Sequence, residues 1–445
     1  MNHVFHRAPR VTLPHAVGGD GVYVIGEDGT RYLDACCGAA VSCLGHSDAT
    51  VRQAMHAQID KLAYVHSGFF TTDVMEELAD RLIGLAPDGL ERVYLLSGGS
   101  EAMEAAIKLT RQYFLEIDKP DRTRIIAREQ SYHGNTLGAL AVGGNKLRRS
   151  PFMPLLIDKV SHIPACNPYR LREDGESLED YALRSANELE TEILRLGPST
   201  VAAFVAETVV GATAGALVPP PGYFKRIREI CDQYGVLLIL DEVMCGMGRT
   251  GTLFACEQEG ISPDLLTTAK GLGAGYQAIG ALLVSKEIFG TLVEGSGSFQ
   301  HGHTYMGHAT ACAAACAVLD VIERDDLLAN VRRQGETLTQ LLHETFDNHP
   351  NVGDVRGRGL FQAIELVADR KTKEPFDPLM KVQARIKTQA MDRNMMCYPF
   401  GGTADGKRGD HVLLAPPFIV TDEQIHEIVR RLKEAVDAAV REVST

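Results

Sequence analysis

Two polar residues, Asp241 and Lys270, each follow a short apolar segment in the middle of the chain. Asp241 ends the run from Val236 to Leu240, a continuous apolar stretch typical of a strand buried on both faces of a parallel sheet. In open α/β sheets, ligands bind just beyond the carboxyl ends of the strands, so we expect Asp241 at a ligand site. Lys270 stands before a glycine-rich turn. A carboxylate and an amine presented from strand ends suit a carbonyl cofactor held by the lysine as a Schiff base.

A glycine-rich turn comprising Gly98, Gly99 and Ser100 follows a predicted strand at residues 91–96 and opens a predicted helix. The free amide groups and the positive dipole end of such a helix can bind a phosphate, and the glycines let the ligand approach the backbone. The alternative is that Ser100 only caps the helix, since serine is a common N-cap residue. The turn alone does not decide between the two interpretations.

Further polar residues follow two other predicted strands. Tyr132 and His133 come after the strand at residues 124–127, and Glu207 comes directly after the strand at residues 201–206. The ring of Tyr132 is either stacked on a flat cofactor or an ordinary half-buried aromatic residue.

The order of the predicted elements indicates how these residues are positioned. Strands alternate with helices from about residue 91 to 285, which favours a parallel sheet built from βαβ units. The helices include residues 178–196 and 223–234, whereas the stretch from 137 to 171 is predicted as a loop. Helices and short strands after residue 325 indicate a separate α+β domain.

Composition and charge narrow the class of protein. A chain of 445 residues, 45% apolar and 23% charged, predicts a soluble globular protein with two domains. The net charge of −13 argues against nucleic acid or an anionic membrane as the main partner. There is no apolar segment long enough to span a membrane and no export leader pattern, so we expect a cytoplasmic protein.

The metal-ligand residue types do not form a recognisable metal site. The ten cysteines are scattered without zinc-ligand spacing, so we expect reduced thiols. His301, His303 and His308 lie close together, yet no carboxylate or cysteine completes a ligand set around them. The sequence therefore predicts no metal.

The ordered set of motifs resembles the class III, or ω-type, aminotransferases that use pyridoxal 5′-phosphate, and the resemblance covers nearly the whole chain. It is carried by six segments in the family's order: Ser97–Ala102, Tyr132–Gly134, Ala206–Glu207, Asp241–Gly251, Ala269–Gly271 and His301–Tyr305. The resemblance implies the α/β architecture of pyridoxal phosphate fold type I. A large domain with a mostly parallel sheet would span residues 61–325, and a smaller α+β domain would combine residues 1–60 and 326–445. It also implies a homodimer with active sites at the interface.

The resemblance also implies roles for individual residues. Lys270 would hold the cofactor and move a proton at the substrate carbon, while Asp241 would pair with the pyridine nitrogen. Gly99 and Ser100 would bind the phosphate, joined by Thr304 from the partner subunit.

Four more positions are assigned by the same comparison. Tyr132 would stack on one face of the cofactor ring and Val243 would pack on the other. Glu207 would sit behind the ring, or serve only as a structural acid at a strand end. His133 fits the motif, with a structural role left open beside a catalytic one.

The reaction implied is a two-stage ping-pong transamination. A small-molecule amine, diamine or ω-amino acid would donate its amino group to the cofactor, and a keto acid, commonly pyruvate in this family, would accept it. Both substrates must share one pocket, which must therefore accommodate a carboxylate and, in turn, a side chain without one.

The chain departs from the family pattern at the substrate site. Many amine:pyruvate members place a carboxylate-binding arginine before the proline of a C-terminal loop, but Tyr398 precedes Pro399 here. We expect Arg408, further along this loop, to bind the carboxylate, because a guanidinium matches a carboxylate bidentately. The alternative is that Arg408 is a solvated loop charge. The small run Ala39–Val41, where some members have a large aromatic residue, leaves room for substrate.

Two other functions share these motifs. An amino-acid racemase or aminomutase on the same fold would use Lys270 and Asp241 as well, but would consume no keto acid. A non-catalytic binding protein is disfavoured because every cofactor-contacting position of the family pattern is present.

Overall fold

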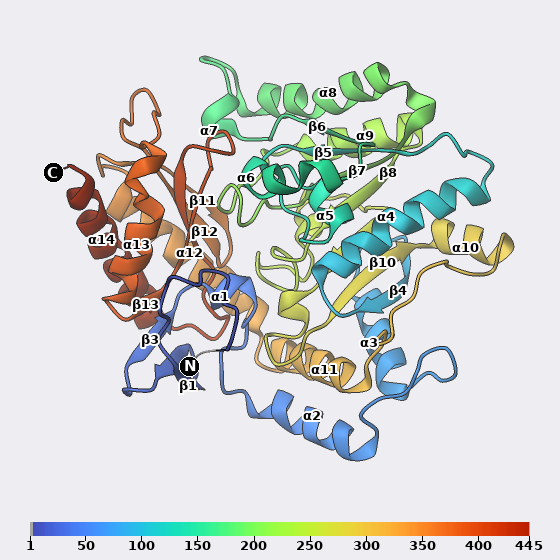
Figure 1. The fold of residues 1–445 in the computed structure, drawn as a ribbon, viewed down its shortest axis with the longest axis horizontal. Helices are drawn as coiled ribbons and strands as arrows, with labels where there is room; N and C mark the ends of the chain where they lie inside the picture. The colour runs from blue at the N-terminus through green and yellow to red at the C-terminus, as the bar shows by residue number, and fades with distance from the viewer. Residues whose placement is uncertain (1–2, 445) are drawn as a thin grey trace.

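A seven-stranded sheet forms the centre of the larger part of the molecule in the computed structural model, which describes residues 3–444 (Figure 1). In spatial order its strands are β4 (Leu90–Leu96), β10 (Gly280–Ser285), β9 (Leu265–Thr268), β8 (Leu237–Asp241), β7 (Val201–Glu207), β5 (Arg124–Arg128) and β6 (Val160–Ile163). The pairs from β9 to β6 are parallel, and only β10 runs against its neighbours. The prediction of a mostly parallel sheet is confirmed.

Helices cover both faces of this sheet, which explains why its central strands are apolar throughout. Every residue of β7 and β8 is buried. Phe204 and Leu238 pack on one face, in the same apolar core as residues of four helices, whereas Val205 and Ile239 pack on the opposite face. The first face is covered by α3 (Asp73–Gly84), α8 (Leu178–Leu196), α9 (Tyr223–Tyr234) and α11 (Ala309–Arg324), and the second by α4 (Gly99–Glu116), α5 (Leu137–Val142) and α10 (Lys286–Glu294). Side chains alternate between the faces because the strand repeat is two residues.

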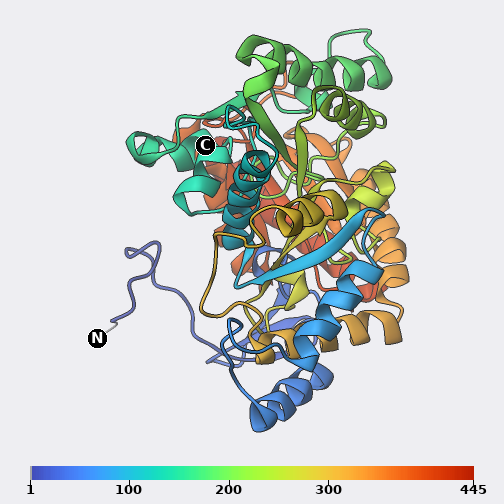
Figure 2. The same cartoon turned by 90° about the vertical axis from the view of Figure 1, so that its right-hand side faces the viewer.

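The two chain ends lie together in a second unit, coloured blue and orange to red in Figure 1. One small sheet joins the ends, because β13 pairs in parallel with β3. Its strands are β1 (Ala16–Asp20), β2 (Tyr23–Gly26), β3 (Arg31–Asp34) and β13 (Met395–Met396). Residues 3–15, before β1, project away from the body of the molecule (Figure 2).

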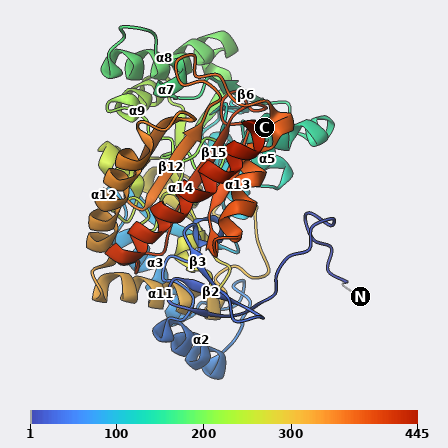
Figure 3. The same ribbon diagram turned by 90° about the vertical axis from the view of Figure 1, so that its left-hand side faces the viewer.

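A four-stranded antiparallel sheet completes this unit, and helix α14 crosses it (Figure 3). In spatial order its strands are β11 (Val352–Arg358), β12 (Phe361–Leu366), β15 (Asp410–Leu414) and β14 (Tyr398–Gly401). The surrounding helices are α2 (Ala49–Lys61), α12 (Leu327–Phe346), α13 (Val382–Met391) and α14 (Asp422–Ser444). The mixture of helices and strands confirms the predicted fold class, while the exact domain limits at residues 60 and 325 stay a prediction.

The loop predicted for residues 137–171 is wrong. This stretch contains α5, the short helices α6 (Lys146–Arg149) and α7 (Pro168–Leu171), and strand β6. Strand β6 has four residues, three of them half-buried, so it carries too little pattern to be recognised. Its place in the sheet is set by parallel pairing with β5 rather than by its own sequence.

Within residues 3–444, no helix combines the length and apolar character needed to cross a bilayer. The ten cysteines are all free thiols with buried side chains.

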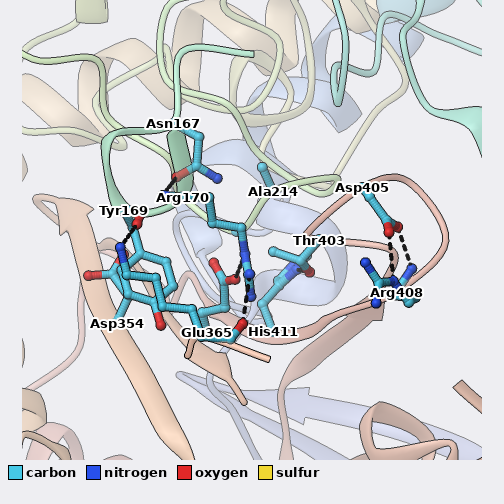
Figure 4. A network of polar contacts seen from close by, with 12 residues as sticks. Asn167, Tyr169, Arg170, Ala214, Asp354, Glu365, Thr403, Asp405, Arg408 and His411 are labelled. Atoms are coloured by element: carbon cyan, nitrogen blue, oxygen red, sulfur yellow. Dashed lines mark hydrogen bonds and ion pairs between the residues drawn. The ribbon is translucent and has the colours of Figure 1, made fainter. Parts of the chain in front are cut away.

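Buried ion pairs join the sheet of the C-terminal unit to the rest of the chain (Figure 4). Arg170 Nε, from α7, lies 2.5 Å from Glu365 Oε1 on β12. Arg356 Nη1, on β11, lies 2.7 Å from the other oxygen of the same carboxylate, and its Nε donates to the carbonyl of Gly215 at 2.7 Å. The Glu365 carboxylate is thereby compensated by two guanidinium groups at the seam between the two units.

His411 lies in the same network and gives the fold a predictable dependence on pH. It is fully buried, and its Nδ1 shares a hydrogen bond of 2.6 Å with Thr403 Oγ1. Burial, and then the nearby charge of Arg356, lower the pKa of His411 to about 3.

Because this imidazole stays neutral in the folded state, acid favours the unfolded chain, where histidine has its ordinary pKa. The stability associated with His411 is present above about pH 6.5 and is lost as pH falls toward 3, by about 2 kcal/mol between pH 6.5 and 4.5. We expect His411→Gln to lose less unfolding free energy over this range than the wild type, measured by urea denaturation at both pH values. Equal losses in both proteins would contradict the assignment.

Candidate active site

A cavity of about 240 Å³ opens at the carboxyl ends of the parallel strands. Eight of the residues predicted from sequence line it: Gly99, Ser100, Tyr132, His133, Glu207, Asp241, Val243 and Lys270. They come from the ends of β5, β7, β8 and β9 and from the start of α4, where the topology of a parallel sheet brings distant segments together.

Asp241 forms the charged floor of this cavity. It is the last residue of β8 and is 5% exposed. One carboxylate oxygen accepts a hydrogen bond from the backbone N–H of Val243 at 3.0 Å, and the other lies 2.8 Å from His133 Nδ1. Since a carboxylate accepts, we assign the Nδ1–H tautomer to His133. His133 therefore orients Asp241, while the opposite ring nitrogen, Nε2, is buried without a hydrogen-bond partner in residues 3–444.

Glu207 is held at the end of the neighbouring strand β7. Its carboxylate accepts hydrogen bonds from the backbone N–H groups of Tyr132, at 2.9 Å, and Gly211, at 2.8 Å. Burial nevertheless raises the pKa of Glu207, outweighing these bonds and the nearby His133. Glu207 thus fixes the backbone that carries Tyr132 and places a second acid beside Asp241.

Lys270 presents its amine to the cavity from the short helix η4 (Lys270–Leu272), which follows β9. Its φ angle of 47° lies in the left-handed region, which is unusual for a residue with a side chain. Such conformations cluster at functional sites, where the surrounding structure holds them in place. Desolvation lowers the pKa of Lys270 below the usual lysine range, although Asp241 and Glu207 act in the opposite direction. A lowered pKa favours the neutral, nucleophilic amine.

The amino end of α4 forms a cradle that suits a phosphate group. Ser97, Gly98, Gly99 and Ser100 all line the cavity at this point. A Cβ atom at Gly99 would lie 2.8 Å from a methyl group of Val243, so glycine is required for the close approach. The first amide groups of an 18-residue helix point outward here, where an anion is stabilised.

Together these features fit pyridoxal 5′-phosphate. The glycine cradle is aimed at the cavity, the carboxylate of Asp241 can pair with a protonated ring nitrogen, and the amine of Lys270 can bond to a carbonyl carbon. Tyr132 and Val243 both line the cavity and can cover the two faces of a flat ring.

Three predicted site residues lie outside this cavity. Thr304 is exposed on the loop before α11, where its carbonyl accepts a hydrogen bond from Tyr64 at 2.9 Å. Tyr398 lines a neighbouring cavity of about 530 Å³. The structure does not bring Arg408 to either cavity, because its guanidinium pairs with Asp405 at 2.8 Å and Glu374 at 3.1 Å on an exposed loop. The expected carboxylate contact of Arg408 stays a prediction, and in this structure two acids pair with its guanidinium instead.

The structure also shows lining residues that the sequence did not reveal. Gln277, Ala278 and Ile279, before β10, contribute one wall, and Val41 contributes another from the N-terminal segment. No motif marks these positions. Val41 does belong to the small run noted in the sequence as leaving room.

Two charged residues of the motifs have structural positions instead. Glu242 is buried and accepts hydrogen bonds from Thr208 and the backbone N–H groups of residues 255 and 256. Arg249 is also buried and donates to the carbonyls of Leu360 and Pro416. Neither residue lines the cavity.

No group of three metal-binding side chains occurs among the described residues. His301 and His303 contact each other, with their Nε2 atoms 3.0 Å apart, and Lys108 lies 3.4 Å from His301 Nδ1. A neighbouring cation disfavours a second positive charge at this place.

Comparison with known families agrees with this geometry, since residues 6–436 match the family described as aminotransferase class III. The chain belongs to the class III aminotransferases. An uncharacterized aminotransferase of Schizosaccharomyces pombe is 48% identical to this class III aminotransferase over 439 residues, covering 99% of this chain and 96% of its own. A diaminobutyrate–2-oxoglutarate transaminase of Halomonas elongata is 34% identical over 435 residues, covering 96% and 91%.

Solved structures support the same assignment. The omega transaminase of Pseudomonas jessenii, crystallised in complex with PMP, superposes with a TM-score of 0.93 at 32% identity. It covers 100% of this chain and 97% of its own. This class III aminotransferase accordingly has pyridoxal phosphate fold type I and depends on pyridoxal 5′-phosphate.

Proposed function

We propose that this aminotransferase moves an amino group from an amine, diamine or ω-amino acid to a keto acid, with pyruvate as the acceptor. The observation that carries the proposal is the single cavity in which Lys270, Asp241 and the glycine cradle meet. With one cavity for both substrates, the two half-reactions follow one another in a ping-pong order.

Each residue has a distinct part in the proposed reaction. When bound, the cofactor accepts electrons from the bond that breaks at the substrate carbon. Asp241 holds its negative charge against the ring nitrogen, and His133 fixes the orientation of Asp241 through the 2.8 Å hydrogen bond. Lys270 takes a proton from the substrate carbon and returns it at the next position, which requires its amine to be neutral.

A panel of amine donors against pyruvate and 2-oxoglutarate tests this function. A transaminase forms one new amino acid for each keto acid consumed, so the two amounts should agree for at least one donor. Conversion of an amino acid with no keto acid consumed would instead indicate a racemase or aminomutase. Conversion of no donor with either acceptor would contradict the proposal.

We further propose that the enzyme acts as a homodimer in which Thr304 of one subunit completes the phosphate cradle of the other. The proposal is supported by Thr304 lying exposed and outside the cavity of its own chain. Analytical ultracentrifugation of the holoenzyme should give twice the mass of one chain, and a monomer would contradict the proposal.

A further inference from the structure

The guanidinium group of Arg148 is stacked between two aromatic rings. Its central carbon lies 4.6 Å from the ring centroid of Tyr132 and 4.8 Å from that of Phe400. Arg148 belongs to the short helix α6, which begins after Asn145, whose side chain accepts a hydrogen bond from the backbone N–H of Arg148. Contact with two rings restrains the guanidinium and leaves its N–H groups available for hydrogen bonds.

This cation has no counter-ion. In the part of the chain that the structure describes, Arg148 takes part in no ion pair, and its buried Nε has no hydrogen-bond partner. Arg170, Arg356 and Arg408 each contact a carboxylate. The neighbouring Arg149 also has a buried Nε without a hydrogen-bond partner, so the contacts with Tyr132 and Phe400 are what distinguish Arg148. A stacked guanidinium with unused donors is prepared to bind a planar anion such as a carboxylate bidentately.

The position of Arg148 relates it to the reacting groups. Tyr132 lines the cavity that contains Lys270, whereas Phe400 lines a separate cavity of about 530 Å³. Arg148 lines neither cavity but contacts both rings, so it connects the wall of one cavity to the wall of the other. Its charge reaches the site, because it contributes to lowering the pKa of Lys270.

The chain directly after β14, the strand that carries Phe400, is anchored to the segment that carries Tyr132. Gln130 donates from its side-chain amide to the carbonyls of Gly402, at 3.1 Å, and Thr403, at 3.3 Å. The two rings are therefore held as a pair, and the cation between them has a fixed place.

We infer that Arg148 binds the carboxylate of the substrate. Tyr398 brings no positive charge to the position where the family pattern has an arginine, and Arg408 pairs with two acids instead. This inference rests on the proposed transaminase function, because it names the residue that recognises the keto acid and the carboxylate of an ω-amino acid. An amine that lacks a carboxylate needs no such contact, so one site can accept both kinds of substrate.

Two amine donors of matched shape can distinguish carboxylate binding by Arg148 from a role in supporting the ring of Tyr132. β-Alanine and propylamine differ by a carboxylate in place of a methyl group, and both would serve as donors in the first half-reaction. For Arg148→Gln we expect KM for β-alanine to rise about 10- to 100-fold, the loss of a charged hydrogen-bonded pair, while kcat/KM for propylamine stays within threefold. Equal losses for both donors would show that Arg148 only supports the ring.

Calorimetric titration of the holoenzyme with propionate gives a second readout that needs no turnover. Its dissociation constant should rise at least tenfold in Arg148→Gln and remain within twofold in Arg149→Gln, which removes an equal charge from the same helix. Arg148→Lys, which retains the charge without the planar edge, should give an intermediate value.

Wild-type affinity for propionate in either folded Arg148 variant, or no propionate binding by the wild type, would overturn the inference. The proposed function is decided separately by the donor panel. A wild type that transfers no amino group but loses propionate affinity on Arg148→Gln would contradict the reaction and retain the anion site.

Discussion

Replacement of Lys270 by alanine is expected to abolish transamination, with kcat reduced by at least about 10⁴-fold. Lys270 follows β9 and has a left-handed backbone conformation. Its surroundings favour the neutral form of its side-chain amine. Alanine removes both the covalent attachment of the cofactor and the group that moves the proton. No other lysine lines the cavity to replace it.

Steady-state kinetics and absorbance spectra measure this effect together. The variant should lose the visible absorption of a cofactor bound through lysine, yet keep a far-ultraviolet circular dichroism spectrum of wild-type shape. Lys286→Ala is the matched control, since Lys286 is exposed at the start of α10 and lies outside the cavity. Activity in Lys270→Ala within tenfold of the wild type would contradict the assigned role. Recovery of some activity on adding ethylamine would show that the loss is of the base rather than of the fold.

The central sheet, and the meeting of Asp241 and Lys270 in one cavity, could be predicted because their physical causes are local. The run ending at Asp241 is apolar at every position, as is typical of a strand that is covered on both faces of the sheet. Strand β8 occupies Leu237–Asp241 as expected. The helices at residues 178–196 and 223–234 were predicted with the limits observed, since a serine cap starts the first and Gly235 ends the second. Parallel strands then place their carboxyl ends at one edge, which gathers the site.

The substrate side could not be predicted in the same way, because it depends on contacts between segments far apart in the sequence. Phe400 and Tyr132 are 268 positions apart in numbering, and only the folded chain stacks Arg148 between them. The sequence predicts a loop for the segment with Arg148, because the four residues Lys146–Arg149 are too few to show a helical repeat. The residue type of Arg408 favours carboxylate binding, but one of the two acids that pair with it, Glu374, lies on a different segment.

Replacement of Asp241 by asparagine is expected to reduce kcat on the order of 10²- to 10³-fold, as for removal of one preorganised electrostatic contact in an active site. Asparagine keeps the shape and can still accept from the backbone of Val243, but it lacks the negative charge that keeps a ring nitrogen protonated. The pKa of Lys270 should fall further, because Asp241 is the largest contribution that raises it. Since the base must be neutral, the acidic limb of the pH–rate profile should move to lower pH.

The adjacent residue offers a control that separates chemistry from folding. Glu242 is as deeply buried as Asp241, but its carboxylate accepts hydrogen bonds from Thr208 and the backbone instead of facing the cavity. Glu242→Gln should lower the unfolding midpoint in urea while each folded molecule keeps its kcat, whereas Asp241→Asn should keep the midpoint and lose kcat. An Asp241→Asn enzyme with kcat within threefold of the wild type would show that charge at this strand end is not required. The opposed results in two neighbouring acids would assign the catalytic charge to the residue that faces the cavity, because the two are adjacent in the sequence and both are buried.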